Sequence, residues 1–288
     1  MDRLHRQRRQ GRRPRPRQRR GRLRLDDVPR AAGEGGRVLE DLPGRRRRPR
    51  RGRRLGLDPG RLPGNYGDNS LLYFNQYRNA APGDPLYDKA RTGTDARKGE
   101  GFFDRLKADV KGGKLPQISW IVAPEAFTEH PNWPANYGAW YVSQVIDALT
   151  ADPEVWARTA LFITYDENDG FFDHLIPPFP PASASQGRST ADAEPDLFKG
   201  GGGHVAGPYG LGQRVPMLVV SPWSKGGFVC SETFDHTSII RFMERRFGVR
   251  EPNISPWRRA VCGDLTAAFD FSRKDTGHVP LPGTAGYL

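Results

Sequence analysis

Apolar residues recur along most of the chain at spacings that predict helices. One helical face is apolar within 102–110, and the segment 138–149 (GAWYVSQVIDAL) has the spacing of an amphipathic helix. A third helix is predicted over 237–247, with Asp235 or Thr237 as its N-cap. Three helices therefore stand out from the pattern alone.

Short apolar runs rich in β-branched residues lie between these helices and predict strands at 117–123, 160–165 and 215–221. Residues 65–79 are polar and aromatic and predict a loop that leads into a short helix, whereas 80–99 is predicted to be loop. Strands that alternate with helices indicate a mainly parallel sheet flanked by helices, which is an α/β fold.

Two segments lack such periodicity. Residues 167–213 are rich in Gly, Pro, Ser and Ala, and a loop of that length is typical of a functional loop or lid. Residues 273–288 read as a loop-like tail. We therefore expect three parts: an Arg-rich stretch over 1–64, a foldable part over 65–272, and the tail.

The net charge of +12 is concentrated at one end of the chain. Residues 1–64 hold 23 arginines against 7 acidic residues, which gives +16, and the other 224 residues carry −4. The stretch has no aromatic residue, no Ile and only two Val, so it cannot bury enough apolar area to offset chain entropy. We expect residues 1–64 to be disordered.

Three interpretations of residues 1–64 compete. Arginine runs at 45–48 and 50–54 suit a basic tail that binds nucleic acid or anionic lipid. A targeting segment requires an apolar stretch that is missing here, so no signal peptide is expected in this chain. The third interpretation, which we favour, is a shifted reading frame of a GC-rich gene, because Arg, Gly and Pro dominate and residues with AT-rich codons are missing.

The two cysteines, Cys230 and Cys262, are too few for a disulfide framework or a metal cluster. They could pair in an oxidising compartment or remain separate thiols, and both alternatives stay open. No apolar stretch is long enough to predict a transmembrane helix.

The strongest chemical signal follows the apolar run 160–165 directly. Asp166, Glu167, Asn168 and Asp169 are consecutive, and ligands bind beyond the carboxyl ends of parallel strands. Oxygen-rich clusters suit hard divalent cations, and Asp173 and His174 follow within reach. Because Asp, Asn and Gly are also ordinary turn residues, composition alone leaves a metal site and a plain turn equally open.

Three histidines in loops or near a helix end are further candidates. His130 follows the strand 117–123 and would share a sheet edge with Asp166 if the two strands are neighbours. His204 ends a Gly-rich run that permits close backbone approach to an anion, and His236 lies at a helix N-terminus. Each of these histidines could equally be an exposed loop residue or part of a helix cap.

Four motifs resemble one known family. The segments 124–131 (PEAFTEHP), 163–174 (ITYDENDGFFDH), 214–244 and 253–271 are similar, in the same order, to the bacterial non-haemolytic phospholipase C and acid phosphatase family. The resemblance covers about 65–272 and implies an alkaline phosphatase-like α/β/α sandwich, incomplete at the N-terminus. It also implies hydrolysis of phosphate esters at a Ser or Thr nucleophile with a divalent metal ion, Ca or Zn.

The family motifs carry roles over to this chain. Asp166 and Glu167 match metal ligands, and His130 matches a catalytic histidine that contacts phosphate oxygens. The remaining residues of these motifs are expected to bind substrate; they are Asn168, Asp169, His174, His204 and His236. The implied substrate is a phosphatidylcholine-like phospholipid, with membrane contact through that substrate and a secreted or periplasmic location.

Two departures from the family pattern limit these expectations. The acidic motif of the type Glu-Asn-Arg-Ser-Phe-Asp-His, which supplies further metal ligands, is missing, and we identify no nucleophile in this chain. We therefore expect a phospholipase C-type hydrolase fragment that is inactive by itself. The alternative is a nucleic-acid or anionic-lipid binder acting through 1–64, although with a shifted frame no nucleic acid partner is expected. Oligomeric state stays open.

Overall fold

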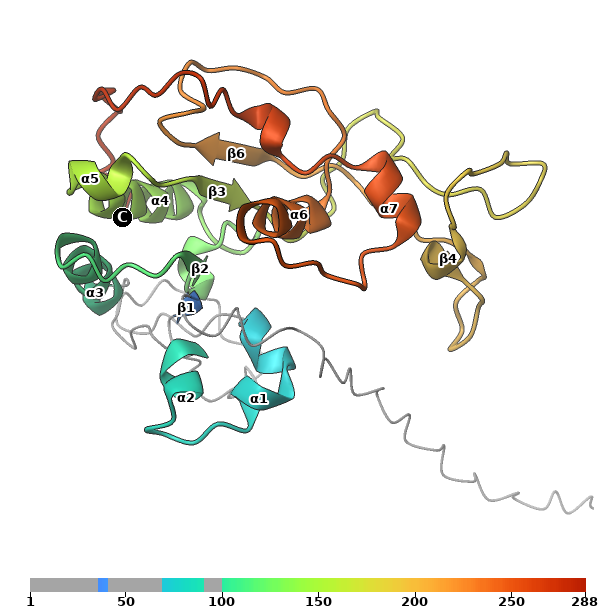
Figure 1. Ribbon diagram of the computed structural model, residues 1–288, viewed down its shortest axis with the longest axis horizontal. Coiled ribbons are helices and arrows are strands. Elements are labelled where there is room, and N and C mark those ends of the chain that lie inside the picture. Colours follow the sequence, from blue (N-terminus) through green and yellow to red (C-terminus); the bar gives the residue numbers. More distant parts are fainter. Residues whose placement is uncertain (1–35, 41–68, 91–99) are drawn as a thin grey trace, which may run out of the picture.

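The computed structural model describes residues 36–40, 69–90 and 100–288, and it mixes helices and strands as an α/β fold does (Figure 1). In this part of the chain the α-helices are α1 (Asn75–Arg78), α2 (Pro85–Ala90), α3 (Glu100–Lys111), α4 (Ala135–Thr150), α5 (Pro153–Trp156), α6 (His236–Phe247) and α7 (Pro256–Val261). Short 3-10 helices also occur in this part of the chain: η2 (Ser70–Tyr73), η4 (Glu125–Phe127), η5 (Glu194–Asp196) and η6 (Thr266–Ala268).

The described strands form three two-stranded sheets. The strands are β1 (Gly36–Glu40), β2 (Ile118–Val122), β3 (Leu161–Thr164), β4 (Leu197–Phe198), β5 (Gly207–Pro208) and β6 (Met217–Val220). Strand β1 pairs with β2 in parallel, whereas β3 pairs with β6 and β4 with β5 in antiparallel fashion. The expectation of a mainly parallel sheet is therefore wrong for the described strands, because β6 returns alongside β3 in the opposite direction.

The largest buried apolar cluster, which we call the aromatic core, lies between α3, α4, η4 and β2. On α4 the buried residues Tyr141, Val145 and Leu149 recur every four positions, so one helical face is covered. The buried members of the aromatic core are Phe103, Leu106, Val110, Ala126, Phe127, Tyr141, Val145, Ala148 and Leu149. The rings of Phe127 and Tyr141 lie 5.5 Å apart, within the range that favours aromatic contacts.

Helix α6 begins and ends with strong local signals. The Asp235 side chain accepts from the Thr237 N–H, and Ser238 completes a capping box at the N-terminus. Gly248 ends the helix in the left-handed conformation that a residue with Cβ rarely adopts. Phe242 of α6 packs edge-on against Phe162 of β3, so the helix covers the β3–β6 pair.

The C-terminal segment 273–288 runs back across the molecule (Figure 1). Lys225 donates to Asp275 at 2.9 Å, and the hydroxyls of Ser143 on α4 and Thr284 lie 2.9 Å apart. This loop-like tail thus joins the end of β6 to α4.

Most elements expected from the pattern are present, with boundaries shifted by a few residues. The predicted loop over 80–99 is wrong at Pro85–Ala90, which form α2, while 91–99 lies outside the described residues. Within 1–64, the backbone of Gly36–Glu40 is a strand rather than disordered, and the rest of that stretch lies outside the description. In the described ranges no helix is both long and apolar enough to cross a lipid bilayer.

Candidate functional site

The first turn of the site follows β2 and is anchored in the aromatic core. Phe127 of η4 is buried, and the Thr128 hydroxyl donates to the Glu125 carbonyl at 2.9 Å. Glu129 then adopts a positive φ of 63°, an uncommon conformation for a residue with a side chain. This backbone reversal presents Glu129 and His130 beyond the end of the strand.

The second turn follows β3 and contains the acidic run. The Asp166 carboxylate accepts from the Glu167 N–H at 3.0 Å, and the Asn168 amide donates to the Phe171 carbonyl at 2.6 Å. Asp169 has a positive φ of 53°. Backbone strain of this kind collects at functional sites, although a tight turn also requires it.

The two turns meet through two side-chain contacts. The Tyr165 hydroxyl donates to Glu129 Oε2 at 2.5 Å, and His130 Nε2 lies 4.0 Å from Asp169 Oδ1. Burial, and after it the hydrogen bond to the Glu129 carboxylate, together raise the pKa of Tyr165 to about 12. Strand β2 pairs with β1 and not with β3 among the described strands, yet the turns after β2 and β3 still come together.

Helix α6 supplies the third part of the site. Nε2 of His236 lies 2.8 Å from the backbone carbonyl oxygen of Tyr165. Because a carbonyl oxygen can only accept, Nε2 carries a proton in this contact, and in the neutral tautomer with that proton Nδ1 is the acceptor nitrogen. The sequence-predicted residues His130, Asp169 and His236 therefore belong to one neighbourhood, organised around Tyr165.

Other predicted site residues are not drawn into this neighbourhood by a described contact. Asp173 is exposed and is ion-paired with Arg214, whose hydrogen bonds hold the pKa of that carboxyl below its usual value. His174 next to it is exposed. His204 lies in the hairpin between β4 and β5, which extends far from β2 and β3 in Figure 1.

The expected metal ligands were tested against the described geometry. Asp166 and Glu167 are both exposed, and Asp166 already accepts the Glu167 N–H. Within residues 36–40, 69–90 and 100–288, no three His, Cys, Asp or Glu residues lie close enough together to hold a metal ion. The described residues therefore do not form a complete metal centre.

Sequence reasoning missed Tyr165 and gave Glu129 no defined role. Tyr165 ends an apolar run and reads as a strand residue, and Glu129 is one of several acidic residues near His130. Their partnership also requires Gly138 on α4, because a Cβ at that position would overlap with the Glu129 side chain. One sequence signal could have indicated the role of Tyr165: it stands directly after a strand and directly before an acidic run.

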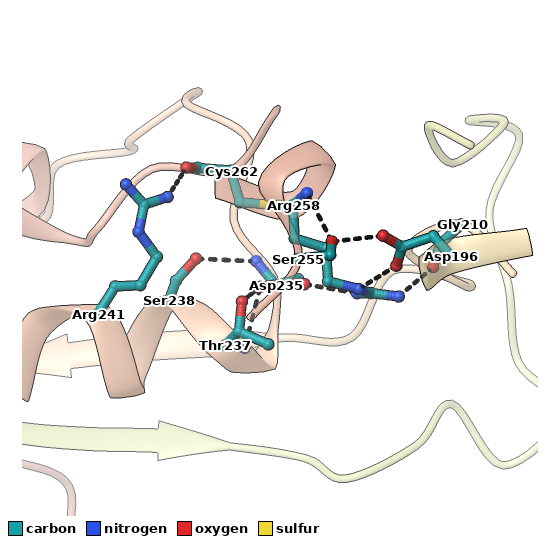
Figure 2. Close-up of polar contacts among 9 residues, drawn as sticks. All are labelled: Asp196, Gly210, Asp235, Thr237, Ser238, Arg241, Ser255, Arg258 and Cys262. Carbon is teal, nitrogen blue, oxygen red and sulfur yellow. Dashed lines mark hydrogen bonds and ion pairs between the residues drawn. The ribbon is translucent and has the colours of Figure 1, made fainter. Parts of the chain in front are cut away.

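A charged cluster behind His236, the Arg258 network, was also missed. It consists of Asp196, Gly210, Asp235, Ser255 and Arg258 (Figure 2). The Arg258 guanidinium donates to Asp196 and to Asp235, each at 2.7 Å. These two carboxylates are 5% exposed, so charges that look like surface residues in the sequence are in fact buried.

Both cysteines are free thiols. Cys230 is exposed, whereas Cys262 is buried next to the Arg258 network, where burial and then the Asp235 carboxylate raise the pKa of the thiol to about 12. The two cysteines are thus unpaired in this structure.

Comparison with known proteins places this site in a family. The sequence profile of the phosphoesterase family matches residues 55–250, which is more than half of the chain. The chain belongs to the phosphoesterase family. The match includes the turns after β2 and β3, and it begins inside the Arg-rich stretch.

Relatives with assigned names are phospholipases C. The chain is 68% identical over 228 residues to a non-hemolytic phospholipase C of Burkholderia pseudomallei, covering 78% of this chain and 33% of the relative. It is 54% identical over 229 residues to a non-hemolytic phospholipase C of Pseudomonas aeruginosa, covering 77% and 32% respectively. Phospholipase C B of Mycobacterium tuberculosis is 41% identical over 206 residues, covering 72% and 38%. The chain thus spans about a third of the length of these relatives.

Proposed function

We propose that this phosphoesterase chain carries part of the active site of a phosphoric diester hydrolase of phospholipase C type, acting on phosphatidylcholine-like lipids. The names of its relatives support a phospholipid substrate, and the phosphatidylcholine-like head group is part of the proposal. The observation that carries the proposal is the meeting of the two strand-end turns, which sets His130 beside Asp169 and near Tyr165 and His236. The proposed complete fold is an alkaline phosphatase-like α/β/α sandwich.

In this proposal each described side chain has a limited task. Nδ1 of His130 contacts Asn132 Oδ1, which orients the imidazole, and Nε2, which faces Asp169, donates a hydrogen bond to a phosphoryl oxygen. His236 is held by the Tyr165 carbonyl through Nε2, which leaves Nδ1 as an acceptor. No described Ser or Thr is assigned as nucleophile, so hydrolysis by this chain alone is expected to be weak or missing.

We further propose that Asp166 and Glu167 contribute two carboxylates to a divalent metal site, of Ca or Zn, that needs ligands besides those described. Bound there, the ion would offset the negative charge of the phosphate ester. Isothermal titration of the chain with Ca²⁺ and with Zn²⁺ tests this. Loss of binding in D166N or E167Q, but not in D147N on the exposed surface of α4, supports it. Equal binding by all variants contradicts it.

The exposed loop after the acidic turn fits contact with a lipid surface. Phe171, Phe172 and Ile176 are 74%, 72% and 79% exposed, and exposed apolar groups of this size mark interaction sites. A secreted or periplasmic location is part of the same proposal. Binding of the chain to phosphatidylcholine vesicles, compared with F171S/F172S, measures this contact.

The activity test compares two histidines. Hydrolysis of a chromogenic phosphocholine ester is measured for the wild type, H130A and H278A, where His278 is an exposed residue of the C-terminal segment. We expect H130A to lower kcat/KM by about 100-fold or more and H278A to leave it unchanged. If the wild type is inactive, binding of phosphocholine by the same three proteins gives the readout. Equal values for H130A and H278A in both measurements contradict the proposed site.

The alternative function, binding of polyanions through 1–64, rests on the 23 arginines of that stretch. Binding to a DNA duplex that falls steeply with added salt would favour it. Binding to phosphocholine that does not change with salt would favour the esterase site.

A further inference from the structure

Arg258 in α7 joins three segments that are far apart in the sequence. Its Nε donates to Asp196 Oδ1 at 2.7 Å, Nη1 to Asp235 Oδ2 at 2.7 Å, and Nη2 to the Gly210 carbonyl at 2.8 Å. Figure 2 shows the guanidinium between the two carboxylates, with Ser255 donating to the other oxygen of Asp196. One side chain thus donates hydrogen bonds to oxygen atoms at the N-cap of α6, in η5 and in the segment before β6.

The burial of this cluster makes Arg258 hard to replace. The Arg258 side chain is 23% exposed, and those of Asp196 and Asp235 are 5% exposed. A buried carboxylate without a cation is strongly unfavourable, and here a single guanidinium compensates two. Lysine could not reproduce the contacts, because its ammonium has no planar fork of donors.

The network acts on the site through Asp235. Asp235 is the N-cap of α6: its Oδ1 accepts from the Thr237 N–H at 2.9 Å, while its Oδ2 takes the Arg258 contact. The next residue, His236, reaches the Tyr165 carbonyl. The position of the first turn of α6, and with it the His236 ring, therefore depends on where Arg258 holds Asp235.

Arg258 also fixes the long segment that follows the acidic turn. Asp196 and Gly210 both belong to the stretch between β3 and β6, whose beginning is the turn with Asp169. The same guanidinium therefore holds this stretch against the start of α6.

We propose that Arg258 is a positioning residue that sets His236 against Tyr165 and latches the 167–213 segment to α6. The proposal rests on the proposed function only in so far as His236 serves that site. The positioning itself can be measured without any catalytic activity.

Arg259, the next residue, provides a matched control. It has the same type and similar exposure, 20% against 23%, and it also forms an ion pair, with both oxygens of Glu244 at 2.8 Å. Its other contacts go to the carbonyls of Glu251 and Ile254. R258M and R259M thus each remove a buried arginine of α7, but only R258M releases Asp235 and the long segment.

The first readout is the tautomer of His236, from histidine side-chain ¹H–¹⁵N spectra of the full chain, assigned with H236Q. We expect the neutral Nε2–H pattern in the wild type and in R259M, and an averaged pattern in R258M. The second readout is tryptic cleavage after the exposed residues Arg188 and Lys199, followed by mass spectrometry. R258M should increase this cleavage about tenfold over R259M, because local opening exposes the segment. An unchanged tautomer pattern in R258M overturns the proposal.

If R258M does not fold, the variant D235N tests the proposal with a smaller perturbation. D235N keeps a good N-cap residue, since Asn caps helices as well as Asp, but it removes the charge that faces Arg258. We expect the same change of the His236 pattern to a smaller extent, and an unchanged pattern overturns the proposal. If the wild type hydrolyses a phosphocholine ester, R258M should lower kcat about tenfold more than R259M, with a smaller effect on KM. Equal phosphocholine binding by H130A and H278A would count against the proposed function and leave the tautomer test intact.

Discussion

The aromatic core and the Arg258 network hold the two sides of the candidate site by different physical means. The aromatic core supports the turn with His130 through non-directional burial of large rings such as Phe127. The Arg258 network supports His236 through a few directional bonds between charged groups. Burial supplies most of the stability, whereas a buried ion pair adds little net stability and fixes a geometry. We therefore expect that the side held by the aromatic core can lose stability and keep its geometry, whereas the side held by the Arg258 network cannot.

The largest expected effect is on the aromatic core. Phe127 is 3% exposed and contacts the rings of Tyr137, Trp140 and Tyr141, so F127A should lower the free energy of unfolding by about 3–5 kcal/mol. Urea unfolding followed by circular dichroism measures this. F228A, at a side chain that is 75% exposed, should change the value by less than about 0.5 kcal/mol. Similar losses in both variants would mean that the core does not carry the stability.

The next effect is on the contact between the two sides. Y165F removes the hydroxyl that donates to Glu129 and should cost about 1–2 kcal/mol, since it leaves a carboxylate oxygen without its donor. The exposed Tyr73 gives the matched control Y73F, for which we expect no change. The double variant Y165F/E129Q should lose less than the sum of the single variants, and strict additivity would argue against a direct bond.

Acid should weaken the α6–α7 side by a smaller amount. Hydrogen bonds from Arg259 hold the pKa of the Glu244 carboxyl below its ordinary value of 4.5. A lowered folded-state pKa stabilises the fold above pH 4.5, and this contribution is lost as the pH falls through the lowered value. E244Q should remove this part of the pH dependence of Tm, while E154Q at an exposed position should keep it. Parallel Tm curves for wild type and E244Q would contradict the assignment.

The smallest effect is a change in local opening, which the reactivity of the two cysteines reports. Cys230 is exposed and should react with a thiol reagent at once, whereas Cys262 is buried with a pKa of about 12 and should react only when the α6–α7 side opens. Mass spectrometry of partly labelled protein separates the two sites. R258M should speed labelling of Cys262 more than F127A does, and the reverse order would reject the division into two independently held sides.

Local sequence patterns predicted the helices and strands well, but they did not predict how strands distant in the sequence pair. The four-residue spacing of Tyr141, Val145 and Leu149 identified α4, and Asp235, one of the two predicted cap residues, is the N-cap of α6. The direction of β6 was not predictable, because the 167–213 segment is long enough to return the chain either way. The alkaline phosphatase-like sandwich stays a prediction.

The candidate site shows the same contrast between local sequence signals and long-range contacts. Polar residues after strands indicated His130 and Asp169, because strand ends bring such side chains together. Tyr165 and Arg258 were missed because their roles depend on partners 36 and 62 residues away, Glu129 and Asp196. The roles of all the predicted site residues stay predictions: His130, Asp166, Glu167, Asn168, Asp169, His174, His204 and His236.

Gly138 lies where two demands on α4 conflict. The stability of the helix favours a residue with a Cβ, but the Glu129 side chain occupies the space that this Cβ would need. Alanine there would strengthen an isolated helix by about 1 kcal/mol, yet its Cβ would overlap with the carboxylate side chain of Glu129. A selection for heat resistance that ignores the neighbouring turn would favour G138A and push Glu129 away from Tyr165. Helix α4 thus retains a residue that weakens it as a helix, and a thermostabilised variant that gained alanine there would be an early candidate for loss of the contact between Glu129 and Tyr165.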